Sequence, residues 1–515
     1  MTDGGARASG RGWIDRRSGE PLYLQVRAYV ERGLAGGAFP ARRPLPSSRH
    51  LAAELGVSRN TINAAYAELV SLGLLEARPR SGLYPSATAT AAAPASQAPP
   101  SASPAAPGSS GAPSAPEAPD WSDHVVPVRD PFPRDRVVEP DYRDFPYPFL
   151  PGQVEERAFP SRAWLRAVTT ALDGPHRRYT LRDSADRDDP LLVEAIRTML
   201  LPAKGIDAAP DEILVTSGSQ QALSVLAAAL LDAGRSVGVE NPGYVDAARI
   251  FHRSGARVTP FPTDRDGVVL PADPDVDLLY VTPSHHHPTN VTLSAARRDA
   301  LLRAATAQDM LVVEDDFDSE VRYVGSPTPT IKSGDAHGRV VYLGTFSKFL
   351  APGLRVGFVV ADAALIRALR DRRYYQTKHP GGHVQRALAV FLTSGDYHRQ
   401  LRRHRVDLRA KWQTLGDALA DEVPWALPER PTGGLSYWLT GPEGFDGTRA
   451  AALARERGVL VSPGELYHLT PDPPRRHLRV GFNAIPQARI VPGVHRLAQA
   501  MRTALDPAAA PAADR

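Results

Sequence analysis

Cysteine is absent from this chain, and lysine is nearly absent. The 515 residues contain no cysteine, which excludes disulfide bonds, thiolate metal ligands and cysteine nucleophiles. Of the 61 basic residues, all but five are arginine; the five lysines are Lys204, Lys332, Lys348, Lys378 and Lys411. Arginine supplies permanent charge, whereas a lysine amine can lose its proton and react as a nucleophile. Each lysine is therefore a candidate for a reactive amine.

Long apolar runs are also missing. No stretch approaches the roughly 20 apolar residues that span a bilayer, and the first seven residues lack the apolar core of a signal peptide. The run from Ala222 to Leu231 fits a buried helix. We therefore expect a soluble cytoplasmic protein, and the length predicts roughly three domains of ordinary size.

Charge and composition divide the chain into parts. Residues 1–84 hold 12 arginines and 7 acidic residues, while the remainder is close to neutral. Residues 86–120 are mostly alanine, proline and serine, and such a segment buries too little apolar surface to fold. We expect a basic module at 15–85, a flexible linker at 86–120 and a large body at 140–505. A basic module on a neutral body suggests a polyanionic partner, although a solvated charged surface would look the same.

The body alternates short β-rich runs with helical stretches, which predicts an α/β domain with a mostly parallel sheet. Helices are expected between the runs, for example at 220–231 and 295–307. Ligands bind beyond the carboxyl ends of the strands in such sheets. The expected strands are 213–216, 236–239, 257–261, 278–281, 310–313, 340–343 and 355–360.

The basic module has the pattern of a helix, a tight turn and a second helix over residues 47–69. Gly56 suits the left-handed turn position, and Ser58 suits the cap of the second helix. Ile62, Ala65, Tyr66 and Leu69 would share one face of that helix, with the polar side chains opposite. Residues 74–84 would form a hairpin wing. Such a helix can contact base edges or phosphates.

The whole module, from Pro21-Leu22-Tyr23-Leu24-Gln25-Val26 to Arg80-Ser81-Gly82, resembles the GntR-type winged helix-turn-helix. The resemblance implies binding to double-stranded operator DNA. The residues expected at the DNA are Arg49, Ser58, Arg59, Asn60, Thr61, Arg78 and Arg80.

Lys348 lies between two apolar runs and precedes Arg355 by seven residues. A Schiff base with pyridoxal phosphate (PLP) needs such an amine on a rigid loop, beside a phosphate-binding arginine. The alternative is a surface lysine in a loop. The turn at Ser217-Gly218-Ser219-Gln220 adds a helix N-terminus, which favours a phosphate.

An acidic cluster, Glu314-Asp315-Asp316, follows another apolar run. An aspartate there can keep a pyridine nitrogen protonated. Without Lys348, the cluster would equally suit a metal ion. Three consecutive histidines at 285–287 also invite a metal, but consecutive side chains rarely converge on one ion; we expect no metal site. Tyr244 offers an aromatic face for ring stacking.

Together these segments resemble a fold-type-I PLP enzyme of the aminotransferase class I/II family, with a small C-terminal α+β part. The resemblance implies that Lys348 is the Schiff-base lysine and that Asp315, rather than Asp316, faces the pyridine nitrogen. It implies that Tyr244 stacks on the ring and that Arg479 holds the carboxylate of an amino acid. It implies a phosphate site made of Ser219, Gln220, Thr345, Ser347 and Arg355.

The two halves together resemble the MocR-type subgroup of GntR regulators, which form head-to-tail dimers. The chain has Phe317 where the subgroup has tyrosine, and His287 where aminotransferases have asparagine. We hypothesise that His287 supplies the hydrogen bond to the 3′-oxygen of PLP that Phe317 cannot make. We expect a transcriptional regulator that senses an amine, an amino acid or PLP. The alternatives are an active aminotransferase with an accessory DNA-binding module, and a body that only dimerises.

Overall fold

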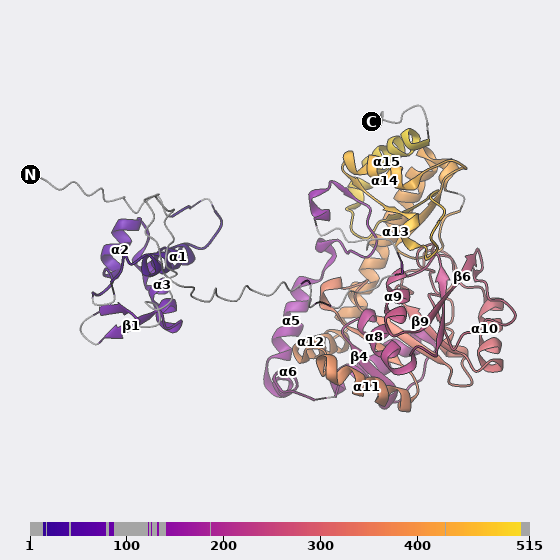
Figure 1. Ribbon diagram of the computed structural model, residues 1–515, viewed down its shortest axis with the longest axis horizontal. Helices are drawn as coiled ribbons and strands as arrows, with labels where there is room; N and C mark the ends of the chain where they lie inside the picture. The colour runs from indigo at the N-terminus through magenta and orange to yellow at the C-terminus, as the bar shows by residue number, and fades with distance from the viewer. Residues whose placement is uncertain are drawn as a thin grey trace, which may run out of the picture. The chain divides into compact units, whose positions relative to one another are not determined.

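The computed structural model describes residues 14–16, 18–40, 43–78, 82–86, 122, 125, 131–132, 141–185, 187–427 and 429–505. The chain divides into two compact units, Met1–His124 and Val125–Arg515, which Figure 1 shows. Most of the predicted linker, 87–120, lies outside the described residues, and so does Arg80. The boundaries predicted for the module and the body stay predictions.

The described residues of the N-terminal unit form three helices and a hairpin. Helix α1 covers Leu22–Ala35, α2 covers Ser48–Leu55 and α3 covers Arg59–Ser71. Strands β1 (Leu75–Arg78) and β2 (Gly82–Pro85) pair antiparallel as the predicted wing. The face of α3 that was predicted to be apolar is buried, at Ile62, Ala65, Tyr66 and Leu69. The winged helix-turn-helix is therefore confirmed.

The turn between α2 and α3 forms as its residues predict. Gly56 ends α2 with φ +70°, a left-handed conformation that strains other residues. The Ser58 hydroxyl accepts a hydrogen bond from the Thr61 amide at 3.1 Å. That bond satisfies one of the free N–H groups at the start of α3 and fixes where the helix begins.

The body is built on an eight-stranded sheet in the order β4-β11-β10-β9-β8-β5-β6-β7. Strands β6, β5, β8, β9 and β10 are parallel to one another, whereas β11 runs antiparallel to both β10 and β4, and β7 runs antiparallel to β6. The mostly parallel sheet is therefore confirmed. The strands are β4 (Ile213–Thr216), β5 (Ser236–Asn241), β6 (Arg257–Asp264), β7 (Gly267–Val268), β8 (Leu278–Val281), β9 (Leu311–Asp316), β10 (Val340–Thr345) and β11 (Gly357–Val360).

Several predicted strand boundaries were wrong, and two of these differences bear on the polar residues at the strand ends. Strand β9 does not end at residue 313 but runs through Glu314, Asp315 and Asp316, all buried. The polarity of these three residues predicted a loop. Each carboxylate has hydrogen-bond donors nearby, however, so the strand can continue. Strand β11 begins at Gly357, because Arg355 has φ +49° and cannot extend a strand.

Helices cover both faces of this sheet. Helices α8 (Ser219–Leu230), α9 (Val245–Arg253) and α11 (Ala363–Thr377) share a core with one face. On the other face lie α10 (Ala295–Ala307), α12 (Gly382–Thr393) and the long α13 (Asp396–Glu422). Alternate residues of the central strands serve the two cores, so the strands read as continuous apolar runs.

A small C-terminal part follows α13. Strands β12 (Ser436–Thr440), β15 (His477–Gly481) and β14 (Ser462–Pro463) form a three-stranded antiparallel sheet. Helices α14 (Gly447–Glu456) and α15 (Ile490–Leu505) pack beside it, at the end of the body away from α11 (Figure 1). This part carries Arg479 on β15 toward the large sheet.

Candidate functional site

A pocket at the carboxyl ends of β4, β8, β9 and β10 gathers all nine residues that were predicted to bind the cofactor. We call it the inner pocket. The nine are Ser219, Gln220, Tyr244, His287, Asp315, Thr345, Ser347, Lys348 and Arg355. Tyr280, Thr282 and Phe317 complete its lining. The residues come from segments more than 130 positions apart, and the sheet brings them together because parallel strands end at the same edge.

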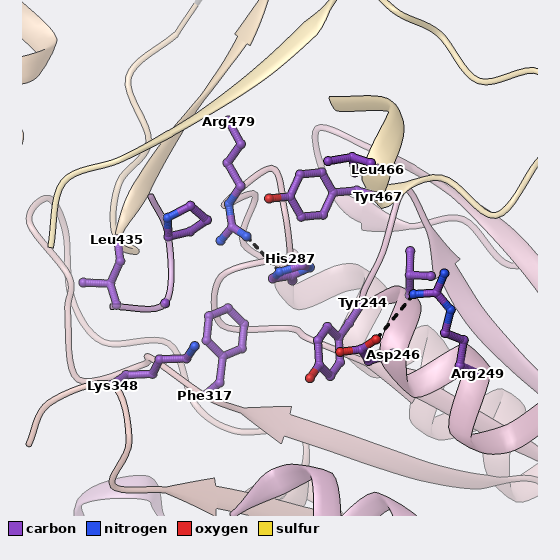
Figure 2. Close-up of a pocket in the computed structure, with 13 residues that line it drawn as sticks. Tyr244, Asp246, Arg249, His287, Phe317, Lys348, Leu435, Leu466, Tyr467 and Arg479 are labelled. Atoms are coloured by element: carbon purple, nitrogen blue, oxygen red, sulfur yellow. Dashed lines mark hydrogen bonds and ion pairs between the residues drawn. The ribbon is translucent and has the colours of Figure 1, made fainter. Parts of the chain in front are cut away.

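A second pocket adjoins the first and shares Tyr244, His287, Phe317 and Lys348 with it. We call it the outer pocket. Figure 2 shows its lining: the Lys348 side chain points into the space beside Phe317, and Arg479 reaches toward His287. The amine and the guanidinium therefore face one continuous space.

Lys348 lies in the loop between β10 and β11. Burial lowers the pKa of its amine, and the positive charge of Arg479 lowers it further. The amine lies 6.0 Å from the centre of the Phe317 ring. A Cβ atom on Gly152 would lie 3.5 Å from the amine. A lysine with a lowered pKa is more readily the neutral nucleophile that Schiff-base chemistry requires.

The other four lysines are bound in ion pairs. Lys204 pairs with Asp316 and Glu320, and Lys411 pairs with Glu155 and Asp407. Lys332 pairs with Asp335, and Lys378 pairs with Asp183. Lys348 has no ion-pair partner among the residues that the structure describes. Its amine is thus distinguished from the others by its surroundings as well as by its sequence.

Asp315 and Asp316 point to opposite faces of β9. The Tyr280 hydroxyl donates to Asp315 Oδ2 at 2.8 Å, while Oδ1 is buried without a partner among the described residues. Burial raises the pKa of Asp315 to about 6, and the Tyr280 bond opposes that shift. Asp316 instead accepts from Tyr342 and Ser319 and pairs with Lys204. Asp315 is therefore the carboxylate that lines the inner pocket.

One part of the inner pocket, around Ser219 and Arg355, is suited to an anion; we call it the anion end. Helix α8 begins at Ser219, directly after Gly218, so its free N–H groups lie at this end. Gly218 has φ +90°, which disfavours other residues, and a Cβ atom there would lie 3.0 Å from Arg355 Nη2. The Ser347 hydroxyl is buried without a partner among the described residues. A phosphate group would satisfy these donors.

His287 connects the two pockets. Its ring makes edge contacts with Tyr244, Phe317 and Tyr467, at centroid distances of 5.4, 6.0 and 5.2 Å. Arg479 Nη1 donates to His287 Nε2 at 2.8 Å. Burial lowers the pKa of His287 well below its ordinary value, and Arg479 adds to that shift. His287 is therefore neutral, and Nε2 accepts from Arg479 while Nδ1 carries the proton.

Arg479 is held by three neighbours in the outer pocket. Its Nε donates to Ser436 Oγ at 2.9 Å, and its guanidinium lies 5.4 Å from the centre of the Tyr467 ring. With Nη1 on His287, Nη2 is left for a ligand. A carboxylate in the outer pocket could pair with this guanidinium.

Tyr280, Ser436 and Tyr467 were not predicted from the sequence. Tyr280 interrupts an apolar strand with a hydroxyl, and that signal could have identified it. Ser436 and Tyr467 lie in segments without a distinctive pattern, and only the tertiary fold brings them to Arg479.

The three consecutive histidines serve three different partners. His285 Nδ1 contacts Asp318 Oδ1 at 2.9 Å, and His286 Nδ1 contacts Thr289 Oγ1 at 2.7 Å. His287 binds Arg479. The imidazoles diverge, as expected for consecutive residues.

In the N-terminal unit, most of the predicted DNA-binding residues lie at the surface. Arg49, Ser58, Arg59, Asn60 and Arg78 are exposed, whereas Thr61 is half-buried. Thr61 and Ser58 share a hydrogen bond between their hydroxyls at 2.8 Å, so both also serve the helix cap. Arg78 lies on the wing, 4.4 Å from the centre of the Tyr84 ring.

Comparison with known proteins supports the folds of both the N-terminal unit and the body. Residues 22–84 match the family model "Bacterial regulatory proteins, gntR family", and residues 156–497 match "Aminotransferase class I and II". The HTH-type transcriptional regulator TauR of Rhodobacter capsulatus is 37% identical over 93% of this chain and 96% of its own. The "Probable rhizopine catabolism regulatory protein MocR" of Rhizobium meliloti is 31% identical over 95% of each chain.

This chain belongs to the MocR-type transcriptional regulators. In this MocR-type regulator, a GntR-type DNA-binding unit precedes a body with the fold of the PLP-dependent class I and II aminotransferases. The relatives favour a regulator over an enzyme with an accessory module.

Solved structures similar to the body of this MocR-type regulator are aminotransferases. LysN, the alpha-aminoadipate aminotransferase of Thermus thermophilus, is 28% identical with a TM-score of 0.65, covering 72% of this chain and 96% of its own. The kynurenine aminotransferase of Pyrococcus horikoshii is 28% identical with a TM-score of 0.64, covering 70% and 91%. Among the described residues, no helix is long and apolar enough to cross a membrane.

Proposed function

We propose that this MocR-type regulator holds PLP through Lys348 and senses an amine or amino acid that enters beside it. The observation that carries the proposal is the lining of the inner pocket. Its lining includes an acceptor, Asp315 Oδ1, and anion donors around Arg355. Lys348 lines both the inner and the outer pocket. PLP has a ring nitrogen, a phosphate and an aldehyde that match these three groups.

The residues of the pocket support this assignment. Within the described part of the chain, Asp315 Oδ1 and Ser347 Oγ have no hydrogen-bond partner, so they can serve a ring N–H and a phosphate. Tyr244 offers its ring beside His287, and Gln220 Nε2 lies 3.4 Å from the Tyr244 hydroxyl. When bound, PLP supplies an aldehyde that captures amines and a ring that withdraws electrons.

The chain's own residues would then do three things. Asp315 would hold a proton on the ring nitrogen, because its Oδ1 has no hydrogen-bond partner among the described residues and can accept one. Lys348 would supply the neutral amine that attaches the cofactor. Arg479 would bind the carboxylate of an effector through Nη2, close to the amine. An effector that binds two conformations unequally would shift the balance between them and thereby alter DNA binding.

The DNA-binding unit would carry the regulatory response by binding operator DNA. On the basis of the GntR match, we propose that seven residues contact the operator: Arg49, Ser58, Arg59, Asn60, Thr61, Arg78 and Arg80. A dimer would present two such units to a two-part operator. We propose the head-to-tail homodimer that the resemblance implies.

The test is absorption spectroscopy of the purified protein with and without borohydride, beside Lys348→Ala. We expect a band at about 410–430 nm that borohydride removes and that the variant lacks. Effector candidates that change this band should also change the affinity for operator DNA. A protein with no band after addition of PLP would contradict the proposal.

An active aminotransferase is the second candidate, because Lys348 and Arg479 are both retained and face one space. Turnover of an amino acid with 2-oxoglutarate separates the two functions. A regulator would show spectral change without sustained product formation, whereas an enzyme would release the oxo acid.

A further inference from the structure

A second large cavity lies behind the strand ends that form the inner pocket, and the function proposed above does not use it. We call it the rear cavity; its volume is about 670 Å³, the size of a small-molecule site. Its walls come from the segments after β8 and β9, from residues 325–333, from residues 199–205 and from α13. The charged residues of its lining are Lys204, Glu320, Arg322 and Arg405.

Two arginines in the rear cavity are oriented before any ligand arrives. Arg405 Nε donates to the main-chain oxygen of Glu320 at 2.6 Å. Arg322 Nε donates to the main-chain oxygen of Val324 at 3.0 Å, and its Nη1 donates to Thr328 Oγ1 at 2.9 Å. Neither guanidinium has a carboxylate partner among the described residues. The terminal nitrogens of both side chains can therefore donate to a ligand, and binding would cost little further conformational entropy.

The rest of the lining fits an anion. Glu320 is the only carboxylate among the described residues that line the cavity, and it already pairs with Lys204 at 3.2 Å. Ser284 and Thr328, which carry hydroxyl groups, also line the cavity. Guanidinium forks together with hydroxyls recognise phosphate oxygens.

We propose that the rear cavity binds a small molecule bearing a phosphate group, with Arg322 and Arg405 as its principal ligands. The volume of about 670 Å³ suits a small molecule rather than the backbone of a DNA duplex.

The rear cavity is placed to influence the inner pocket. Lys204 lines it and pairs with Asp316 at 3.1 Å, and Asp316 is joined directly to Asp315 in β9. His285 also lines it, two residues before His287. A phosphate that draws Lys204 from Asp316 would leave that carboxylate uncompensated beside Asp315. Occupancy of the rear cavity would then alter the absorption of PLP-loaded protein, a consequence that rests on the function proposed above.

The binding test does not depend on PLP. Inorganic pyrophosphate is titrated calorimetrically into the full-length Arg355→Gln variant, in which the anion end of the inner pocket is disabled. Added to that background, Arg322→Gln with Arg405→Gln should weaken pyrophosphate binding about tenfold or more, because two charged donors are lost. Arg409→Gln is the matched control, since it removes an exposed arginine from the same helix, α13, outside the cavity. The control should change the affinity less than about twofold.

Equal affinity in the double variant and the control would overturn the proposal, as would the absence of any pyrophosphate binding in the background. If the double variant weakens binding to double-stranded DNA while pyrophosphate binding is unchanged, the arginines contact DNA and the proposal is wrong. Should the double variant fail to fold, Arg405→Lys keeps the charge without the fork and should bind pyrophosphate more weakly. Loss of the PLP band alone would contradict only the function proposed above.

Discussion

In the protein without cofactor, folding buries the Asp315 carboxyl where its charged form is disfavoured. Its buried carboxyl has a pKa of about 6, above the ordinary value of 3.8, because burial disfavours the charge. A carboxyl whose pKa is raised by folding stabilises the protein below the unfolded pKa and loses that contribution as pH rises through the folded pKa. Near neutral pH, Asp315 therefore costs stability in the protein without cofactor.

Asp315→Asn should accordingly stabilise the cofactor-free protein at pH 7, on the order of 1–3 kcal/mol, and should weaken retention of PLP. Thermal unfolding of both proteins measures the difference, which should shrink as pH falls from 6 to 4 and the parent carboxyl takes up its proton. Tyr280→Phe is the control, because it removes the donor but keeps the carboxylate. A variant no more stable than the parent at any pH would contradict this.

His287 has an imidazole whose hydrogen bonds are set by Arg479. If His287 compensates for Phe317, as the sequence suggested, His287→Phe should shift the absorption of PLP-loaded protein or its dependence on pH. Spectrophotometric titration measures this. His286→Phe is a control of equal size change, at a histidine that bonds Thr289. An unchanged titration in His287→Phe would count against the hypothesis.

Single residues with unusual chemistry were the most predictable part of the site. The scarcity of lysine indicated Lys348, and glycine and serine before a helix indicated the anion end. The partners that hold these residues were not predictable, because Tyr280, Ser436 and Tyr467 reach the site only through long-range packing.

At the scale of elements, the helix-turn-helix was predicted closely because its signals are local. The left-handed glycine, the serine cap and the apolar face all lie within 15 residues. The end of β9 was not predicted, since donors from distant segments allow its carboxylates to be buried.

Substitutions in helix α3 and in the wing should affect sequence specificity and general affinity for DNA differently. Asn60→Ala should weaken operator binding by about 1–3 kcal/mol if it contacts a base edge, and should relax discrimination among sequences. Arg78→Ala on the wing should weaken binding to all duplexes alike and reduce the dependence on salt. Binding titrations on operator and scrambled DNA at several salt concentrations measure both. Equal losses on both duplexes for Asn60→Ala would contradict a role in base recognition.

The cap of α3 can be tested without DNA. Ser58→Ala removes the acceptor of the Thr61 amide and should destabilise the N-terminal unit by about 1 kcal/mol. Ser58→Asp, which keeps an acceptor at the helix start, should retain stability. Chemical denaturation monitored by circular dichroism measures the change, and equal stability of the two variants would argue against the cap.

At the scale of the whole molecule, the proposed dimer determines how the regulator binds DNA. Two units in one dimer should bind DNA with two half-sites about 10²- to 10⁴-fold more tightly than DNA with one, provided that both can engage. Sedimentation equilibrium establishes the dimer, and binding titrations on the two kinds of duplex measure the gain. Equal affinity would mean that only one unit binds at a time.

The isolation of Lys348 has a consequence for chemical selectivity in the cell. Exposed amines add to aldehydes such as PLP without discrimination, yet this chain carries its positive charge almost entirely as arginine. Four of the five lysines have their amines in ion pairs, and one has no such partner among the described residues. A protein of this composition resists stray modification by the compound it is proposed to detect, so its response reports on a single amine.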